Sequence, residues 1–142
     1  MRTSKLLAAA TIVFLSTLAC TRVAYRPLLP AQVADWKMVA NSLSCASAIP
    51  PNLNLSPDTA KARQVCTAQY VGNPNIAVTV YAMPDSSAAF EAVQHWSQPQ
   101  SGKGAFYQDN LFVIVESPST DIPTLARFSN PLKSTLAGQQ HN

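Results

Sequence analysis

Three cysteines are the residues of this 142-residue chain whose type and spacing most directly suggest chemistry: Cys20, Cys45 and Cys66. An odd number leaves one cysteine outside any intramolecular pair, so one of the three is expected to have a separate role. Cys45 and Cys66 could form a disulfide, remain two free thiols or contribute to a metal site. The metal site is the weakest hypothesis, because there is no Cys-x-x-Cys motif and the two histidines, His95 and His141, are isolated.

The first twenty residues indicate the cellular compartment, and the compartment in turn favours one of these roles for the cysteines. Arg2 and Lys5 form a short positive region, and an uncharged apolar run of 14 residues follows at positions 6–19. This is the layout of an export signal. The run is shorter than the about 20 residues that a helix needs to cross a bilayer, and Arg22 prevents its extension. The sequence therefore predicts a signal peptide over residues 1–19 rather than a permanent transmembrane helix.

The end of this segment indicates a role for the first cysteine. The sequence Thr17-Leu18-Ala19-Cys20 resembles the lipobox of bacterial lipoproteins, although the commonest form of that motif has leucine one position earlier. The resemblance implies cleavage after Ala19 and attachment of a diacylglycerol to the Cys20 thiol. Two or more buried acyl chains anchor a protein stably, at about 0.8 kcal/mol per buried CH₂. The alternative is an ordinary secretory signal cut near Ala19, with Cys20 free.

Export also favours a disulfide between the other two cysteines, because an exported protein can keep a pair oxidised. A Cys45–Cys66 bond would close a loop of about 20 residues and contribute on the order of 3 kcal/mol in the chain-entropy model. The segment 43–57 around Cys45 is rich in Pro, Ser and Asn and is predicted to be a loop. A covalent link would therefore hold down a segment with little apolar periodicity. Two free thiols remain the alternative.

Removing the signal changes the charge of the chain. Arg2 and Lys5 are two of the ten basic residues, so eight remain against seven acidic residues, and the net charge falls from +3 to +1. This balance excludes a nucleic-acid-binding footprint. Residues 20–30 are predicted to be a tether, residues 31–138 a single domain and residues 139–142 a disordered tail.

Two further patterns resemble catalytic or ligand-binding motifs, but for each of them a purely structural role is the favoured interpretation. Glu91 and His95 lie four residues apart on a predicted helix, where an exposed i, i+4 pair is favoured over an acid/base or ligand pair. The segment 101–104 contains Gly-Lys but lacks the first glycine and the following Ser/Thr of a phosphate-binding loop. Neither G-x-S-x-G nor H-E-x-x-H occurs, so no enzyme activity, cofactor or metal is inferred.

The first half of the domain reads as strands joined by loops. Strands are predicted for Val65–Val71 and Ile76–Met83, which are joined by turn residues at 72–75. Residues 31–42 fit a short helix or a strand, and the alternation in Trp36–Ala40 favours the strand. Ile76–Met83 is apolar on both faces, which favours a central position in a sheet. Pro57 at a first helical position predicts one or two helical turns before the strand Val65–Val71.

The second half adds a helix, a hairpin and a helical end. A helix capped by Asp85 or Ser86 is predicted to run to about Gln98, with a stripe that faces the sheet and comprises Ala89, Val93 and Trp96. Residues 105–108 and 111–116 are predicted to pair across Asp109-Asn110, a link suited to positive φ.

After the hairpin, Thr120 or Asp121 can cap a helical segment, and Asn130-Pro131 is expected to restart a last turn that Gly138 ends. The predicted fold is α+β. It comprises an antiparallel sheet of about four to five strands built from two hairpins, one main helix between them, and a C-terminal helical segment.

The pattern from Tyr70 through Glu116 also carries a resemblance. It reads as a strand hairpin, a helix containing Ala-Ala-Phe-Glu-Ala-Val-Gln, and an aromatic hairpin ending in Val-Ile-Val-Glu-Ser. This pattern resembles uncharacterised exported domains of bacterial envelope proteins, over about a third of the chain. Its motifs are packing residues, so the resemblance implies an α+β fold and no activity.

Together these features predict a lipid-anchored bacterial cell-envelope protein that acts as a binding or structural module. Its expected partners are the membrane, through the Cys20 lipid, and an unidentified envelope protein. Thr21 is not the aspartate that resembles an inner-membrane retention signal, so the outer membrane is favoured if the host has one. The alternatives are a periplasmic small-ligand carrier, which a pocket lined by Tyr70, Tyr81 or Trp96 would favour, and, with less support, an enzyme.

Overall fold

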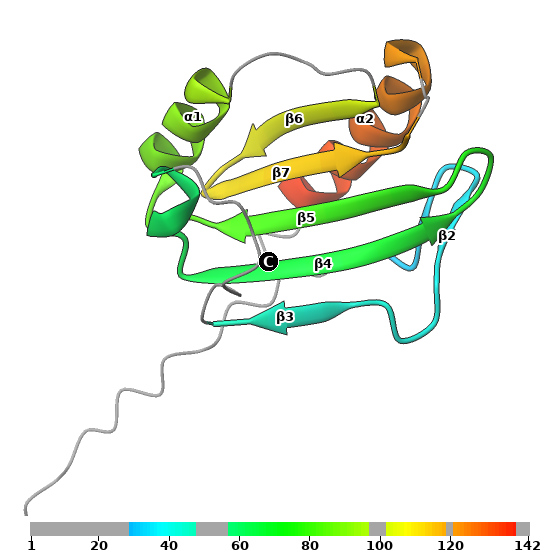
Figure 1. Ribbon diagram of the computed structural model, residues 1–142, viewed down its shortest axis with the longest axis horizontal. Helices are drawn as coiled ribbons and strands as arrows, with labels where there is room; N and C mark the ends of the chain where they lie inside the picture. Colours follow the sequence, from blue (N-terminus) through cyan, green and yellow to red (C-terminus); the bar gives the residue numbers. More distant parts are fainter. Residues whose placement is uncertain (1–28, 48–56, 97–101, 119–120, 139–142) are drawn as a thin grey trace, which may run out of the picture.

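The computed structural model describes residues 29–47, 57–96, 102–118 and 121–138, which form an antiparallel sheet and two α-helices (Figure 1). The predicted signal peptide, Cys20 and the predicted tail lie outside the described residues. The strands are β1 (Gln32–Val33), β2 (Trp36–Met38), β3 (Ser44–Ala46), β4 (Gln64–Val71), β5 (Ile76–Ala82), β6 (Lys103–Gln108) and β7 (Leu111–Glu116). The helices are a 3-10 turn, η1 (Thr59–Lys61), and the α-helices α1 (Ser86–His95) and α2 (Ile122–Gly138).

The α+β class is confirmed, but the sheet has seven strands where four to five were predicted. Its order is β1-β2-β4-β5-β7-β6, and β3 pairs with β4 beside β2. The two unpredicted strands are β1, with two residues, and β3, with three residues inside the segment expected to be a loop. Strands of two or three residues are too short to show an alternating pattern in the sequence. They form because neighbouring strands offer them backbone hydrogen bonds.

The strongest strand prediction is confirmed. β5 lies between β4 and β7, and every described pairing of the sheet is antiparallel. The β6–β7 hairpin is also confirmed, with Asp109 at φ +50° in its two-residue turn. Left-handed backbone at this point is what a tight two-residue hairpin requires.

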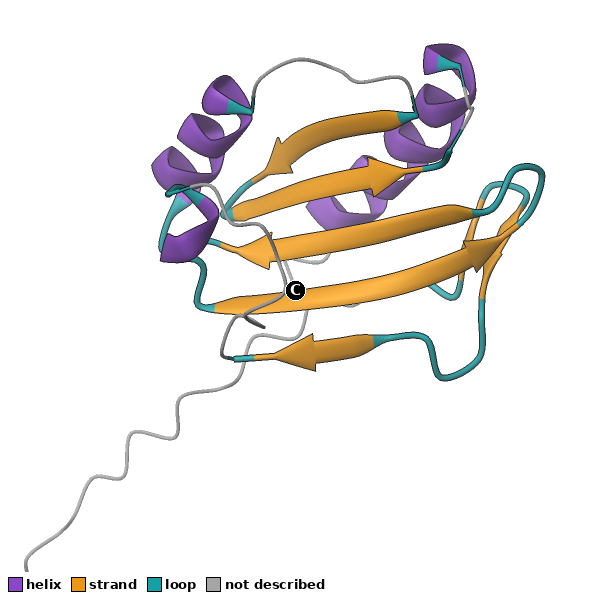
Figure 2. Ribbon diagram, viewed as in Figure 1, coloured by secondary structure: helices purple, strands orange, loops and turns teal. Residues whose placement is uncertain are grey.

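The two helices cover opposite faces of the sheet. Alternate residues of β5 contact them: Val78 and Val80 belong to the core cluster of α2, whereas Tyr81 belongs to the cluster of α1. Helix α2 packs against the face of the sheet that carries Val78 and Val80, and Figure 2 shows this helix passing behind the strands. Its buried side chains are Leu125, Phe128, Leu132 and Leu136. At the centre of the α2 core, Phe128 packs edge-to-face against Trp36 and Tyr70, with ring centroids 5.6 and 5.1 Å away.

Helix α1 starts where expected, because the Asp85 side chain accepts a hydrogen bond from the backbone N–H of Ala88 at 2.8 Å. All three residues of the predicted stripe contact the core on this face of the sheet: Ala89 is buried, and Val93 and Trp96 are half-buried. Ala92 is also buried there.

Helix α2 is one continuous helix, so the predicted restart at Asn130-Pro131 is wrong. Pro131 removes one backbone donor from the helix, but Phe128 and Leu132 remain on the same buried face and hold the two halves in line. The start of α2 is capped by Asp121, whose carboxylate accepts from Thr124 N at 3.0 Å. Hydrogen bonds from Thr124 lower the pKa of the Asp121 carboxyl.

Candidate functional site

Cys45 and Cys66 form a disulfide, as the sequence predicts. The two residues are directly opposed in the β3–β4 pairing, with their Cα atoms 4.1 Å apart. Cys66 is fully buried, whereas the strand that carries Cys45 is mostly exposed. The bond therefore fastens a three-residue strand to the sheet and leaves neither thiol free to act as a nucleophile. Within the described ranges, no group of three or more His, Cys, Asp or Glu residues could hold a metal ion.

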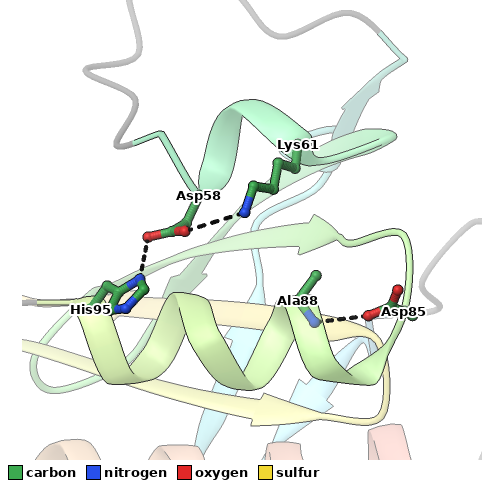
Figure 3. Close-up of polar contacts among 5 residues, drawn as sticks. All are labelled: Asp58, Lys61, Asp85, Ala88 and His95. Atoms are coloured by element: carbon green, nitrogen blue, oxygen red, sulfur yellow. Dashed lines mark hydrogen bonds and ion pairs between the residues drawn. The ribbon is translucent and has the colours of Figure 1, made fainter.

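His95 contacts Asp58, which is distant in the sequence, rather than Glu91 on its own helix (Figure 3). The His95 Nδ1 atom lies 3.0 Å from Asp58 Oδ2, and the other carboxylate oxygen lies 3.7 Å from Lys61 Nζ. Asp58 is the residue that precedes the η1 turn, so this cluster ties that turn to the end of α1. Sequence reasoning missed the pair because nothing local relates residues 37 positions apart.

A histidine held by a carboxylate is an arrangement used in acid/base catalysis. Here the His95 side chain is 66% exposed, and neither it nor Asp58 lines either of the two grooves described below. An exposed pair of this kind contributes about 0.2–1 kcal/mol to stability. The cluster is therefore assigned a structural role.

An apolar groove, here called the edge groove, lies between α1, β6 and α2 and has a volume of about 400 Å³. Trp96 lines it at the end of α1. The remaining lining residues are Lys103, Gly104, Ala105 and Phe106 of β6, and Ile122, Leu125, Ala126, Ser129, Asn130 and Lys133 of α2. Trp96 is one of the three aromatic residues whose presence in a pocket would favour the ligand-carrier alternative.

The other two aromatics, Tyr70 and Tyr81, are buried in the core on opposite faces of the sheet. The Tyr70 hydroxyl donates to Pro30 O at 2.8 Å, and the Tyr81 ring stacks on Phe112 at 5.6 Å. Burial raises the pKa of both hydroxyls, and for Tyr81 the negative charge of Glu116 raises it further. Both tyrosines are therefore packing residues, neutral at physiological pH.

Several large apolar side chains are exposed around the edge groove. Ile122, at the first position of α2, is 71% exposed. Phe90 and Tyr107 form an exposed edge-to-face pair at the other end of β6, with centroids 5.4 Å apart. The ammonium of Lys133 lies 5.8 Å from the centre of the Tyr107 ring. The rim of the edge groove thus combines exposed apolar groups with a cation. The sequence analysis did not predict that these residues lie close to one another.

A second, more polar groove crosses the part of the sheet that carries Gln69, Ala77, Glu116 and Lys103, which are register neighbours on four adjacent strands. Its volume is about 730 Å³. Lys103 Nζ and Glu116 Oε1 lie 2.7 Å apart, so the two charges of this row neutralise each other. The edge groove is therefore the better candidate for recognition.

Comparison of the chain with protein-family models, with curated proteins and with solved structures found no match. In the part of the chain that the structure describes, neither α-helix is long and apolar enough to cross a membrane.

Proposed function

We propose that this chain is a lipid-anchored protein of the bacterial cell envelope that acts as a binding module. Cys20 would carry the lipid, and the edge groove would contact a partner protein. The observation that supports binding is the 71% exposure of Ile122 beside a groove that Trp96 also lines. Exposed apolar groups grouped around a groove are characteristic of interaction sites.

The proposal assigns no catalytic step, because the cysteines and the histidine among the described residues are engaged away from the edge groove. Cys45 and Cys66 bond to each other, and His95 is held by Asp58 at the surface. The groove instead presents aliphatic and aromatic side chains, two lysines, and the polar side chains of Ser129 and Asn130. These groups are suited to binding rather than to bond cleavage.

A small-ligand carrier is the second candidate, because Trp96 lines a groove whose volume of about 400 Å³ lies in the range of ligand pockets. Such pockets normally bury most of the ligand surface. The exposure of Ile122 at the rim favours a larger partner that covers the groove from outside.

The anchor is tested by metabolic labelling with palmitate in the bacterial host. The wild-type chain is expected to take up label, and Cys20→Ala is expected to lose it. Label that persists in the variant, or its absence from the wild type, would contradict lipid attachment at Cys20.

The groove is tested by a photocrosslinking amino acid placed at Ile122 in cells. The matched control is Val39, which is also apolar and exposed, at 43%, but lies next to β2 at the opposite side of the sheet. We expect a protein-sized adduct at Ile122 and none at Val39. A small-molecule adduct would favour the carrier instead, and equal adducts at both positions would remove the groove from the proposal.

A further inference from the structure

We infer that the edge groove binds an extended, acidic peptide segment of a protein partner, which pairs as an additional strand with the outer edge of β6. This inference rests on the proposed function and names the class of partner. It follows from four features of the described residues: the unequal edges of the sheet, the register of β6, the two walls of the groove and its charge.

The two edges of the sheet are unequal. On one side the sheet ends in β1, with two residues, and in β3, with three residues fixed by the disulfide. Very short edge strands limit pairing with other chains. On the other side β6 is the last strand, has six residues, and pairs only with β7 among the described strands. The longer edge is therefore the one that can accept another strand.

The register shows which backbone groups of β6 point outward. Ser117 N donates to Gly102 O at 2.7 Å, and β6 continues from this point as a regular antiparallel pair with β7. Backbone groups alternate in such a ladder, so Gly104, Phe106 and Gln108 share the orientation of Gly102 and bond to β7. The N–H and C=O groups of the remaining β6 residues point outward; these are Lys103, Ala105 and Tyr107.

The walls of the groove match the alternating side chains of a strand. Trp96 stands on the α1 side, and Ile122 and Leu125 stand on the α2 side. At Gly104 a Cβ would lie 3.9 Å from Leu125 Cδ1, so the absence of a side chain keeps the floor between the walls open. A bound strand would direct successive side chains to opposite faces, first towards Trp96 and then towards Ile122.

The charge of the groove favours an acidic segment. Its two charged lining residues are Lys103 and Lys133, and none of the lining residues is acidic. Glu116 already neutralises Lys103. Lys133 lies over the Tyr107 ring, and no described carboxylate forms an ion pair with it. A carboxylate of the partner near the Tyr107 end of β6 would complete this contact.

A second copy of the chain fits the same edge less well. An antiparallel pairing of two β6 strands about Ala105 would place Lys103 of one copy opposite Tyr107 of the other. Because Lys133 lies over Tyr107, this arrangement brings two lysines together on each side of the pair. Since Glu116 is already paired with Lys103, a second copy offers Lys133 no free carboxylate here, so the symmetric dimer fits less well than an acidic segment.

The probe is a synthetic ten-residue peptide of alternating valine and threonine with two aspartates at one end, added to the full chain in detergent. Amide hydrogen exchange followed by NMR should slow at Lys103, Ala105 and Tyr107. Exchange at Gly104 and Phe106, already bonded to β7, should not change. Two further peptides carry N-methyl groups on alternate amides, so that each loses the donors of one edge only. One of them should bind like the parent and the other at least about tenfold more weakly.

Variants of the chain provide an independent readout by fluorescence anisotropy. Ala105→Pro removes an outward N–H and keeps the pairing with β7, since proline is tolerated where an edge N–H faces solvent. It should weaken binding at least about tenfold. Lys133→Glu should weaken it about fivefold. The matched control, Lys37→Glu, reverses an exposed charge on β2 and should leave affinity unchanged.

Strand addition is refuted if the peptide binds without slowing the three outward amides, or if both N-methylated peptides bind equally. It is also refuted if sedimentation shows a dimer that Ala105→Pro dissociates, because a second copy then occupies the edge. An Ile122 crosslink to a protein in cells, together with no peptide binding, would retain the proposed function and reject this inference. Failure of that crosslink would reject the proposed function itself.

Discussion

The Cys45–Cys66 bond allows a quantitative prediction from the structure. The two residues are 21 positions apart, and the chain-entropy model converts a loop of this length into about 3.3 kcal/mol of stability. We expect the double substitution Cys45→Ala with Cys66→Ala to lower the free energy of unfolding by about this amount. For a domain of this size the melting temperature should fall on the order of 10–20 °C.

While the variant is still folded, the loss of local stability should be greatest in β3. Ser44 and Cys45 are exposed and Ala46 is only half-buried, so few apolar contacts retain this strand once the bond is gone. Amide exchange should therefore accelerate at β3 well below the global transition, whereas β5 and β7 remain protected. This local effect separates a lost crosslink from a general loss of packing.

The assay is urea and thermal unfolding followed by circular dichroism, for the oxidised chain, the reduced chain and the variants. Either single substitution should cost as much as the double one, because each removes the same link. The m-value should rise without the bond, since the unfolded chain becomes less compact. A loss below about 1 kcal/mol would refute the reasoning, because it would show that the bond does not restrict the unfolded chain as the model assumes.

Three further predictions concern the core and the cap of α2. Val80→Asp places a charge at a fully buried position and should cost more than about 4 kcal/mol, so that the chain fails to accumulate; a variant that melts like the wild type would contradict the assigned core. Gly72→Ala sets a methyl group against the Trp36 ring and should cost about 1–3 kcal/mol, whereas the control Gly138→Ala, with open space around it, should cost nothing measurable by urea unfolding. Because the folded-state pKa of Asp121 is lowered, its contribution is present above the unfolded value of about 3.9 and is lost as pH falls through the folded value. Asp121→Asn keeps a capping oxygen and should reduce the acid sensitivity of the melting temperature, and an unchanged pH profile would exclude this role.

Elements defined by local chemistry could be predicted from the sequence. β5 follows from an apolar run bounded by turn residues, and the β6–β7 hairpin follows from Asp109-Asn110, whose residue types accept positive φ. The start of α1 follows from Asp85 as a capping residue. Each of these depends on residues within a few positions of one another, so the pattern is visible without knowledge of the fold.

The secondary-structure predictions were wrong where a local sequence rule competed with tertiary packing. Pro131 was expected to interrupt the last helix, but burial of Phe128 and Leu132 on one face outweighs one missing hydrogen bond. β3 was expected to be loop, because three residues carry no periodicity of their own. In the fold its strand character comes from the opposed position of Cys45 and Cys66.

The sequence by itself predicted the pairing of Cys45 with Cys66, from the number of cysteines and the compartment that the first twenty residues indicate, and the structure contains this disulfide. The export signal and the lipid on Cys20 remain predictions of the same kind. Only the tertiary structure decided that His95 meets Asp58, and that Trp96, β6 and Ile122 enclose one groove. These contacts join residues far apart in the chain, and sheet register and helix packing set them after the local elements have formed.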